Sequence, residues 1–292
     1  MNYKGTVILE GGANRGVFTA GVLDFLMEKD IYFSNIIGVS AGSCNGVNYA
    51  SHQRGRSKNS IIIDKKENKY INKNKIISNN ILDMDKLFVT FPQETFPFDY
   101  SSFIKNGHDV DIAVTNCISG ECEYLKLDAE NKNLESCRAS CSMPLAAPIV
   151  NLNSIAYIDG SVSNSIPLER AYEIGNKIII LVLTQKKGYI KKGNNLIAEK
   201  LVKRQYKNYP KAIESYMQRP QRYNKRLNEI SELERMNSIF VIRPEVDTIS
   251  HLEEDVSVLT DFYKHGYELM NRRYAELQTY IQKKIILENS KN

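Results

Sequence analysis

The chain has 292 residues, of which 42% are hydrophobic and 25% are charged, and its formal net charge at pH 7 is +5. This composition is typical of a globular protein and excludes collagen-like, low-complexity and wholly disordered chains. No stretch approaches the ~20 uninterrupted apolar residues that a membrane-spanning helix needs. The first residues also lack the apolar core and the cleavage site of a signal peptide, so we expect a cytoplasmic protein.

The first half of the chain alternates short apolar runs with helical patterns. Residues 6–9 form an apolar run bounded by glycines, which predicts a buried strand. Apolar side chains then recur at helical spacing from Gly16 to about Asp30. Residues 36–39 predict a second strand, and residues 41–50 predict the next helix. This alternation favours a parallel sheet.

Later apolar runs extend the predicted sheet. The clearest is residues 177–184, whose centre is continuously apolar. Further strands are predicted at residues 110–115, 124–125, 156–158 and 238–242. Helices on both faces of a mainly parallel sheet would bury these runs. We therefore predict an α/β fold with three layers in the order α/β/α.

The chain divides into a core, residues 1–185, and a mostly helical C-terminal extension, residues 186–292, which we expect to pack on the core. An insertion at about residues 51–108 interrupts the core. It begins with a segment rich in Lys, Arg and Asn, residues 54–75, and continues into an aromatic stretch at residues 88–103. This stretch could form a lid over a groove, or it could cover the core.

The extension contains a basic helical region, residues 195–237, in which tyrosines alternate with Lys and Arg. A solvated helical face is the commonest explanation of such a pattern. Attraction to an anionic membrane is the second explanation. A nucleic-acid surface is the last, so we expect no nucleic-acid partner. Four lysines follow the clearest strand and could bring the edge of the sheet to a membrane: Lys186, Lys187, Lys191 and Lys192. A long helical pattern, residues 256–287, ends the chain.

The strongest motif is Gly38-Val39-Ser40-Ala41-Gly42, which matches G-x-S-x-G between a predicted strand and a predicted helix. A nucleophile elbow must lie at such a junction. The small residues let the chain turn tightly, and the turn lifts the Ser40 hydroxyl out of the sheet beside the positive end of the next helix. We therefore predict that Ser40 is a catalytic nucleophile, with a plain Gly/Ser turn as the alternative.

A second turn of small residues joins the first predicted strand to the first helix, and it comprises Gly11, Gly12, Ala13, Asn14, Arg15 and Gly16. Its backbone N–H groups could stabilise an oxyanion. A loose dinucleotide-binding turn and a structural turn without a ligand are the alternatives. The next strand runs into the Ser40 motif and lacks the acid that a dinucleotide site requires, which favours the oxyanion role.

A serine nucleophile needs a base, and Asp159 offers one in the Asp159-Gly160-Ser161 turn after a predicted strand. An acid at the end of a strand can point into a site at the carboxyl edge of the sheet. An ordinary Asp-Gly turn would have the same sequence. His251 and His265 lie in the helical C-terminal region, where a solvated face is the simpler explanation.

Five cysteines, an odd number, indicate free thiols and not a disulfide framework. Cys117, Cys122, Cys137 and Cys141 are spaced too widely for a zinc ribbon. We therefore expect no metal and no other cofactor. Cys44 follows the predicted nucleophile by one helical turn, and packing within the helix is its simplest role.

Taken together and in this order, these motifs resemble those of the patatin-like phospholipase family. The resemblance covers about residues 5–185 and rests on four stretches: residues 10–24 (EGGANRGVFTAGVLD), the pentapeptide around Ser40, the Asp159-Gly160 pair and residues 139–144 (ASCSMP). Residues 240–244 and 262–267 are similar to the C-terminal extension of a bacterial subgroup of the family.

The resemblance implies a phospholipase A or lysophospholipase type of serine acyl hydrolase, which cleaves carboxylic ester bonds of lipids through an acyl-enzyme. Ser40 would be the nucleophile, Asp159 its proton acceptor, and the loop from Gly11 to Gly16 the oxyanion hole. Two positions depart from the family pattern. Ala13 replaces a glycine of the loop, and Ser161 replaces the usual Gly or Ala. Ala13 should still donate its N–H if its backbone angles are ordinary.

The implied dyad contains no histidine. One alternative is a Ser–His–Asp triad, because Ser40, Asp159 and then His251 or His265 follow the chain order of α/β-hydrolases. Another is a non-catalytic lipid-binding module on a spent hydrolase fold. In each case the expected ligand is a lipid or a small ester, with peripheral contact with the inner face of an anionic membrane.

Overall fold

The structure is a computed structural model that describes residues 1–72 and 81–290. Its centre is one eight-stranded sheet with the order β5-β6-β3-β2-β1-β7-β8, and β4 pairs with β3 off this path. The strands are β1 (Asn2–Leu9), β2 (Tyr32–Val39), β3 (Asp109–Asn116), β4 (Cys122–Leu125), β5 (Val150–Leu152), β6 (Ile155–Asp159), β7 (Ile178–Val182) and β8 (Phe240–Ile242).

Five strands form the parallel part of the sheet. β1 pairs in parallel with β2 and β7, β2 with β3, and β7 with β8. β4 and β6 run antiparallel to β3, and β5 runs antiparallel to β6. The prediction of a mainly parallel sheet is confirmed. β5 was not predicted, and β1 and β2 begin earlier in the chain than the apolar runs suggested, because their first residues are polar or partly exposed.

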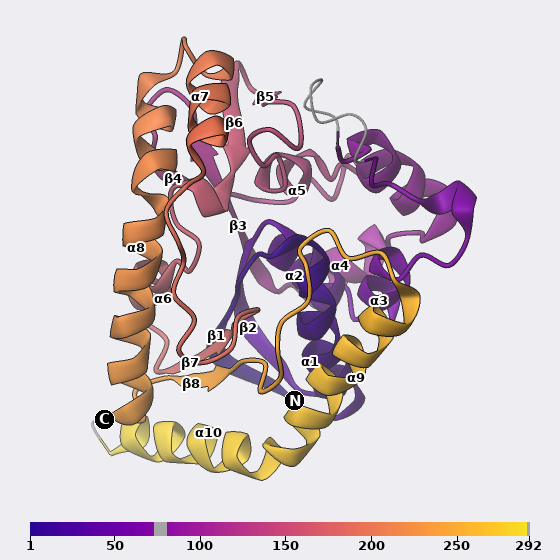
Figure 1. Cartoon of the computed structure of the whole chain (residues 1–292). Coiled ribbons are helices and arrows are strands. Elements are labelled where there is room, and N and C mark those ends of the chain that lie inside the picture. Colours follow the sequence, from indigo (N-terminus) through magenta and orange to yellow (C-terminus); the bar gives the residue numbers. More distant parts are fainter. Residues whose placement is uncertain (73–80, 291–292) are drawn as a thin grey trace.

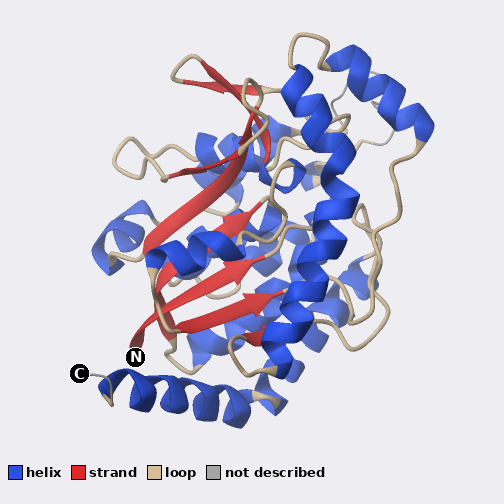
Figure 2. Ribbon diagram, turned by 90° about the vertical axis from the view of Figure 1, so that its left-hand side faces the viewer, coloured by secondary structure: helices blue, strands red, loops and turns tan. Residues whose placement is uncertain are grey.

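Helices cover both faces of the sheet, as Figures 1 and 2 show. Successive side chains of a strand point to opposite faces, so Val7 and Leu9 pack with one group of helices and Ile8 packs with the other. The first group is α1 (Gly16–Glu28), α2 (Ala41–Ala50) and α9 (Val256–Arg272), and the second is α6 (Leu168–Ile174) and α8 (Pro210–Arg235). The three-layer α/β/α prediction is therefore confirmed.

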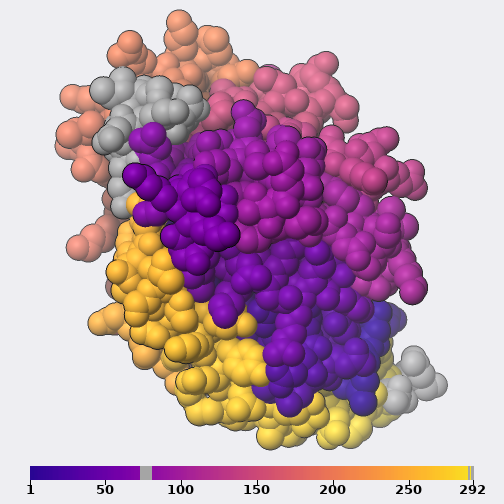
Figure 3. All heavy atoms as spheres, turned by 90° about the vertical axis from the view of Figure 1, so that its right-hand side faces the viewer, coloured from indigo at the N-terminus to yellow at the C-terminus, as the bar shows by residue number. Residues whose placement is uncertain are grey.

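The insertion between α2 and β3 is built from short helices: α3 (Arg56–Ile61), η2 (Lys66–Asn68), the π-helix η4 (Lys86–Thr95) and α4 (Tyr100–Asn106). Figure 3 shows its purple surface beside the yellow residues of the C-terminal helices. Residues 73–75, which end the predicted basic segment, lie outside the described residues.

The C-terminal extension contributes to the sheet as well as to its cover, because β8 extends the sheet beyond β7. The predicted helix at residues 256–287 is two helices, α9 and α10 (Tyr274–Asn289), which meet at Arg273. The basic region likewise contains two helices, α7 (Leu196–Gln205) and α8. The division of the chain into two domains after residue 185 stays a prediction.

α9 crosses α1 at very short range. A Cβ atom on Gly21 of α1 would lie 2.1 Å from the carbonyl oxygen of Tyr263. A Cβ atom on Gly266 of α9 would lie 2.2 Å from the carbonyl oxygen of Phe18. Each glycine thus lets the backbone of one helix touch the backbone of the other. The extension is packed on the predicted core through this crossing.

Candidate active site

Ser40 lies at the junction of β2 and α2, and its backbone is strained. Its φ is 53° and its ψ is −128°, a conformation that residues with a side chain rarely adopt. A Cβ atom on Gly38 would lie 2.4 Å from the Cα of Ser43. A Cβ atom on Gly42 would lie 2.2 Å from the carbonyl oxygen of Leu9. Only glycine fits at these two positions, so the motif permits the strained turn that presents Ser40 to a cavity.

A second serine, which the sequence did not single out, holds this turn. Ser140 is the last residue of α5 (Glu135–Ser140) and is fully buried. Its Oγ accepts a hydrogen bond from the Ser40 N–H at 2.8 Å and donates one to the carbonyl oxygen of Ala113 at 2.6 Å. Ser140 belongs to the ASCSMP stretch that carried the resemblance, and this contact gives that stretch a structural role.

Asp159 is the last residue of β6 and is fully buried. Its Oδ1 accepts a hydrogen bond from the Ser161 N–H at 2.8 Å. Its Oδ2 has no hydrogen-bond partner among the described residues. Burial raises the pKa of this carboxyl above its ordinary value, and the Ser161 and Ser40 hydroxyls and the charge of Arg219 offset part of the rise. The unpartnered oxygen can accept a proton.

The register of the sheet brings Asp159 to Ser40. We expected the aspartate at the end of a strand, at the carboxyl edge of the sheet, and β6 reaches that edge from the opposite direction because it runs antiparallel to β3. Asp159 pairs with Val114 of β3, while Val39 pairs with Ala113. Ser40, one residue after Val39, is therefore in register with Val114 as well. Ser40 and Asp159 thus lie on opposite sides of β3, both beside Val114.

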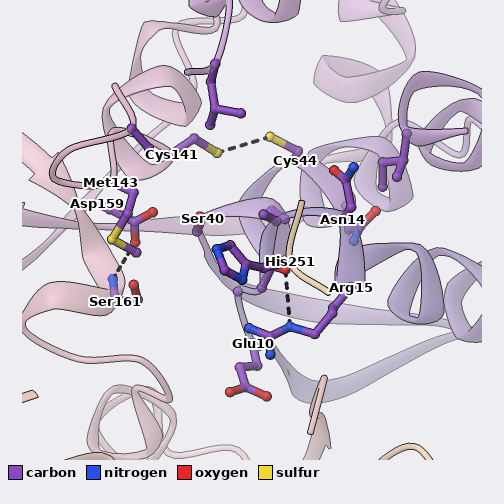
Figure 4. A pocket seen from close by; sticks show the side chains of 18 of the residues that line it. Glu10, Asn14, Arg15, Ser40, Cys44, Cys141, Met143, Asp159, Ser161 and His251 are labelled. Carbon is purple, nitrogen blue, oxygen red and sulfur yellow. Dashed lines mark hydrogen bonds between the residues drawn. The ribbon is translucent and has the colours of Figure 1, made fainter. Parts of the chain in front are cut away.

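Ser40 and Asp159 share one cavity, where Figure 4 shows them with His251. The Ser40 hydroxyl is close enough to lower the pKa of Asp159. No hydrogen bond of accepted geometry joins the two groups, since Oδ2 has no partner. Catalytic hydrogen bonds are often long without substrate and tighten when it binds. The arrangement thus holds Ser40 and Asp159 near each other without a closed proton-transfer contact.

The glycine loop lines the same cavity through Gly11, Gly12 and Ala13. Within the described ranges, the N–H groups of these three residues donate no hydrogen bond. Ala13 has a φ of 49°, in the left-handed region that favours glycine. The condition that we set for Ala13, ordinary backbone angles, is therefore not met. Its N–H is held in a geometry that an alanine adopts only at a cost of roughly 1–2 kcal/mol.

The rest of the loop is already engaged. The Asn14 N–H donates to the carbonyl oxygen of His251 at 3.1 Å, and the Arg15 N–H donates to that of Gly12 at 3.1 Å. Gly16 begins α1 and does not line the cavity. An oxyanion would therefore be held by the first half of the loop, while the second half is fixed by the C-terminal part of the chain.

His251 lines the cavity and is exposed to solvent there, so the expected solvated position holds but the expected helix does not. It lies in the loop between β8 and α9 and not in a helix. Burial lowers the pKa of its imidazole, and the positive charge of Arg15 lowers it further. No hydrogen bond joins this imidazole to Ser40 or Asp159 in the described part of the chain. The structure thus removes the positional objection to His251 as a triad member.

His265 has a different environment. It lies in the middle of α9, and its Nε2 accepts a hydrogen bond from the Glu245 N–H at 3.0 Å. Its ring packs against Phe18 and Phe262. His265 is not part of the cavity lining, so its role is packing.

The cavity has a volume of about 480 Å³ and two chemically different sides. Its apolar side is lined by side chains from α2, the insertion and the approach to α5: Val47, Ile61, Leu82, Phe88, Phe91 and Leu134. Phe88 and Phe91 of η4 are buried in the packing as well. The aromatic stretch therefore covers the core and also forms a wall of the cavity. An acyl chain fits such a wall.

The other side of the cavity is polar and basic, and most of its residues come from the C-terminal extension: Arg15, Lys191, Tyr216, Arg219, Tyr223 and His251. The expectation of a solvated face is wrong for the α8 residues Tyr216, Arg219 and Tyr223. They repeat at intervals of three and four residues, which is one face of a helix. That spacing was the available signal, but the sequence did not show what the face contacts.

Three free thiols lie in the cavity wall: Cys44, Cys137 and Cys141. The sulfur atoms of Cys44 and Cys141 are 3.7 Å apart. Cys44 thus packs against α5 as well as within its own helix. Among residues 1–72 and 81–290, no group of three or more His, Cys, Asp or Glu side chains is arranged to hold a metal ion.

Residues 7–172 match the family described as Patatin-like phospholipase, and residues 209–282 match a domain of unknown function, DUF6363. The first match spans more than half of the chain. The chain therefore belongs to the patatin-like phospholipase family, as the motifs suggested.

Two known proteins are similar to the chain. An uncharacterised protein of Escherichia coli K12, YjjU, is 28% identical over 185 residues, which are 61% of this chain and 51% of that protein. The chain thus spans about half the length of this curated relative. The crystal structure of VipD from Legionella pneumophila superposes with a TM-score of 0.50 and 11% identity, covering 95% of this chain and 67% of that one. This likeness shows the fold alone.

Proposed function

We propose that the protein is a serine acyl hydrolase that cleaves carboxylic ester bonds of lipids through a Ser40–Asp159 dyad. The observation that carries this proposal is that Ser40 and Asp159 lie on opposite sides of β3 at the same position of its register. Ser40 has a strained backbone, and the buried Asp159 Oδ2 has no hydrogen-bond partner among the described residues. Membership of the patatin-like phospholipase family and the apolar wall of the cavity support a lipid substrate.

In the proposed reaction, the Ser40 Oγ attacks the ester carbonyl carbon while its proton passes to the Asp159 Oδ2. N–H groups of Gly11, Gly12 and Ala13 stabilise the negative charge on the carbonyl oxygen. The carbon–oxygen bond to the alcohol then breaks, and the alcohol takes the proton from Asp159. Water repeats the same steps on the acyl-enzyme and releases the fatty acid.

A Ser–His–Asp triad is the second candidate mechanism, and His251 is the observation that favours it. The imidazole lines the same cavity as Ser40, and burial favours its neutral, proton-accepting form. A spent hydrolase fold that only binds lipid is the non-enzymatic alternative.

The experiment that tests the function uses Ser40→Ala and a fluorophosphonate probe. We expect the wild type to hydrolyse short p-nitrophenyl esters and to become labelled at Ser40. The variant should keep its circular dichroism spectrum and lose both activities, because it lacks the hydroxyl that forms the acyl-enzyme in the proposed reaction. Unchanged turnover in the variant would refute the proposal, and a wild type that neither turns over nor labels would indicate a spent fold.

We also propose that the protein works at a membrane surface. No helix within residues 1–72 and 81–290 is long and apolar enough to cross a bilayer. Large apolar side chains are nevertheless exposed in residues 190–197, the segment that contains Lys191 of the cavity: Ile190 is 72% exposed, Leu196 73% and Ile197 69%. Lys192 and Lys200 are exposed beside them in sequence. This combination suits shallow insertion into an anionic lipid surface.

A further inference from the structure

Three thiols meet where α2 and α5 approach each other. Cys44 lies in the first turn of α2, Cys137 lies in α5, and Cys141 directly follows α5. The Cys44 Sγ is 3.7 Å from the Cys141 Sγ, and Figure 4 shows this contact above Ser40. The two cysteines are 97 positions apart in sequence. Their contact is therefore a product of the tertiary fold and not of local structure.

Two of these thiols can be reached from the cavity. All three line its wall, where Cys44 and Cys141 are partly exposed and Cys137 is buried. Cys137 precedes Cys141 by four residues, so both belong to the same side of the turn that ends α5. A small solute that enters the cavity can contact the Cys44 and Cys141 sulfur atoms. This pair is accessible as well as close.

The surroundings of Cys44 favour its thiolate. Hydrogen bonding by the Cys137 and Cys141 thiols holds the pKa of Cys44 well below its ordinary value, and the positive charge of Arg56 contributes, while burial opposes the decrease. The position of Cys44 in the first turn of α2 acts in the same direction. The pKa values of Cys137 and Cys141 are raised well above the ordinary value by the interaction with Cys44 and by burial. Cys44 is thus the thiol that ionises, beside protonated neighbours.

The other two cysteines have the opposite character. Burial raises the pKa of Cys117 to about 12 and that of Cys122 to about 11. Neither is among the described residues that line the cavity. Thiols of this kind react slowly, because the thiolate is the nucleophile. The chain therefore separates one reactive thiol pair from two unreactive cysteines.

A bond between the two sulfur atoms would disturb the candidate active site. Cys141 directly follows Ser140, whose Oγ holds the Ser40 N–H. The next residue, Ser142, accepts a hydrogen bond from the Asp159 N–H at 3.0 Å through its carbonyl oxygen. A disulfide bond is about 2.0 Å long, so the sulfur atoms must move towards each other. The displacement falls on the segment that holds both Ser40 and Asp159.

We propose that Cys44 and Cys141 form a reversible disulfide in response to a peroxide, and that this bond inactivates the hydrolase. The Cys44 thiolate attacks hydrogen peroxide, an S–O bond forms, the O–O bond breaks, and hydroxide leaves and takes up the thiol proton as water. The Cys141 thiol then attacks the resulting sulfenic acid, an S–S bond forms, the S–O bond breaks, and a second water leaves. The two sulfur atoms lose two electrons, which reduce the peroxide. The effect on turnover rests on the proposed function, whereas the bond itself does not.

Peptide mapping tests the bond. The protein is treated with hydrogen peroxide, its remaining thiols are blocked with iodoacetamide, and tryptic peptides are analysed by mass spectrometry. Trypsin cuts after Arg138, so Cys137 and Cys141 fall in different peptides. We expect residues 30–54, which contain Cys44, to be linked to residues 139–170, and dithiothreitol to release them. Absence of a linked peptide would overturn the proposal, and a link to Cys137 would overturn the assignment of the pair.

Turnover of short p-nitrophenyl esters tests the inactivation. Peroxide should lower kcat of the wild type by at least about tenfold, because the segment around Ser140 moves, and dithiothreitol should restore it. Each variant is compared with its own reduced form. Cys44→Ser should keep its turnover after peroxide, and Cys141→Ser should form no link and accumulate a sulfenic acid that dimedone labels. Cys122→Ser is the matched control and should respond as the wild type does, since Cys122 is also partly exposed.

The outcomes separate this inference from the proposed function. Equal loss of turnover in Cys44→Ser and the wild type would assign the inactivation to another group, such as the cavity residue Met143, whose sulfoxide dithiothreitol does not readily reduce. That result, or unchanged turnover in fully linked protein, would overturn the inactivation. A reduced wild type that hydrolyses no ester would refute the proposed function, while the peptide map would still decide whether the disulfide forms.

Discussion

The hydroxyl of Ser140 accepts a hydrogen bond from the N–H of Ser40 at 2.8 Å, and it simultaneously donates to the carbonyl oxygen of Ala113 at 2.6 Å. A single buried side chain thus ties the strained turn to β3, the strand that lies between Ser40 and Asp159. Strained backbone persists only where its surroundings enforce it. Ser140 is therefore a positioning residue for Ser40, the proposed nucleophile.

Ser140→Ala should lower kcat by about tenfold and leave KM almost unchanged, because it loosens the turn without touching the cavity wall. Stability should fall by about 1–2 kcal/mol, since two buried backbone groups lose their partner. Steady-state kinetics and thermal unfolding measure the two effects. Ser142→Ala is the control, because the Ser142 Oγ donates to the carbonyl oxygen of Arg138 and not to the turn. Equal effects of both changes on kcat would contradict the positioning role.

Asp159→Asn should abolish turnover and stabilise the fold at neutral pH. Burial raises the folded pKa of Asp159 above its unfolded value. Its contribution to stability is therefore fully present below the unfolded pKa, about 4, and is lost as the pH rises through the folded pKa. The asparagine variant does not undergo this loss. Its melting temperature should exceed that of the wild type by a margin that grows from about pH 4 towards neutrality.

Thermal unfolding at several pH values checks this prediction, with Asp128→Asn as a control at a carboxylate outside the cavity. A melting-temperature difference that shrinks with rising pH would show that the charged form of Asp159 is stabilised and not destabilised by its surroundings. In the wild type, activity should fall on the acidic side as Asp159 becomes protonated, because a protonated carboxyl cannot accept the Ser40 proton.

The histidine variants decide between dyad and triad. With Asp159 as the only base, His251→Ala should retain turnover within a few-fold of wild type. His265→Ala should do the same, since His265 lies outside the cavity. Loss of a triad histidine costs several orders of magnitude in kcat. If His251→Ala is as inactive as Ser40→Ala while its fold is intact, the triad is the mechanism.

Gly266→Ala should destabilise the protein by about 2 kcal/mol, although alanine favours helices more than glycine does. The added methyl group would lie 2.2 Å from the carbonyl oxygen of Phe18 and would force α9 away from α1. Chemical denaturation measures the change. Gly193→Ala is the matched control, because a Cβ atom there meets nothing within 4 Å. Two equally stable variants would mean that the helices can move apart without cost.

Replacing Leu196 and Ile197 together by serine should reduce binding to anionic vesicles at least about fivefold, because two exposed apolar side chains would no longer enter the lipid surface. Co-sedimentation with vesicles of increasing anionic content measures binding, and added salt should weaken it. Ile104→Ser is the control, since Ile104 is 52% exposed but lies on α4. Equal binding of the wild type to neutral and anionic vesicles would refute the electrostatic part.

Local sequence rules predicted the parts of the site that depend on local geometry. The α2 bounds of Ala41–Ala50 agree with the predicted helix, and the turn around Ser40 follows from glycines that no larger residue could replace. The sequence placed Asp159 at the end of a strand but did not show how that strand is paired. The antiparallel course of β6, which brings it to Ser40, depends on pairing between distant strands and leaves no short-range pattern.

The basic side of the cavity could not be predicted because it is assembled by tertiary packing. The spacing of Tyr216, Arg219 and Tyr223 defines one face of α8, but periodicity does not say whether a polar face meets solvent or a cavity. His251 was assigned to the helical region that follows it, but it lies in the loop of residues 243–255 before α9. His251, whose variant distinguishes the dyad from the triad, therefore lies in a loop, and local sequence patterns say little about where a loop residue points.

The hydrogen bond from the Asn14 N–H to the carbonyl oxygen of His251 connects the proposed oxyanion loop to the C-terminal part of the chain. Local opening of the segment between β8 and α9 would release that amide to solvent, so its hydrogen-exchange rate measures how often the segment leaves the loop. Any condition that frees the segment would also free the backbone next to Ala13, whose left-handed conformation is unfavourable without such support. If the loop forms the oxyanion hole as proposed, the time it spends in the competent conformation depends on the opening of a segment more than two hundred residues away in sequence.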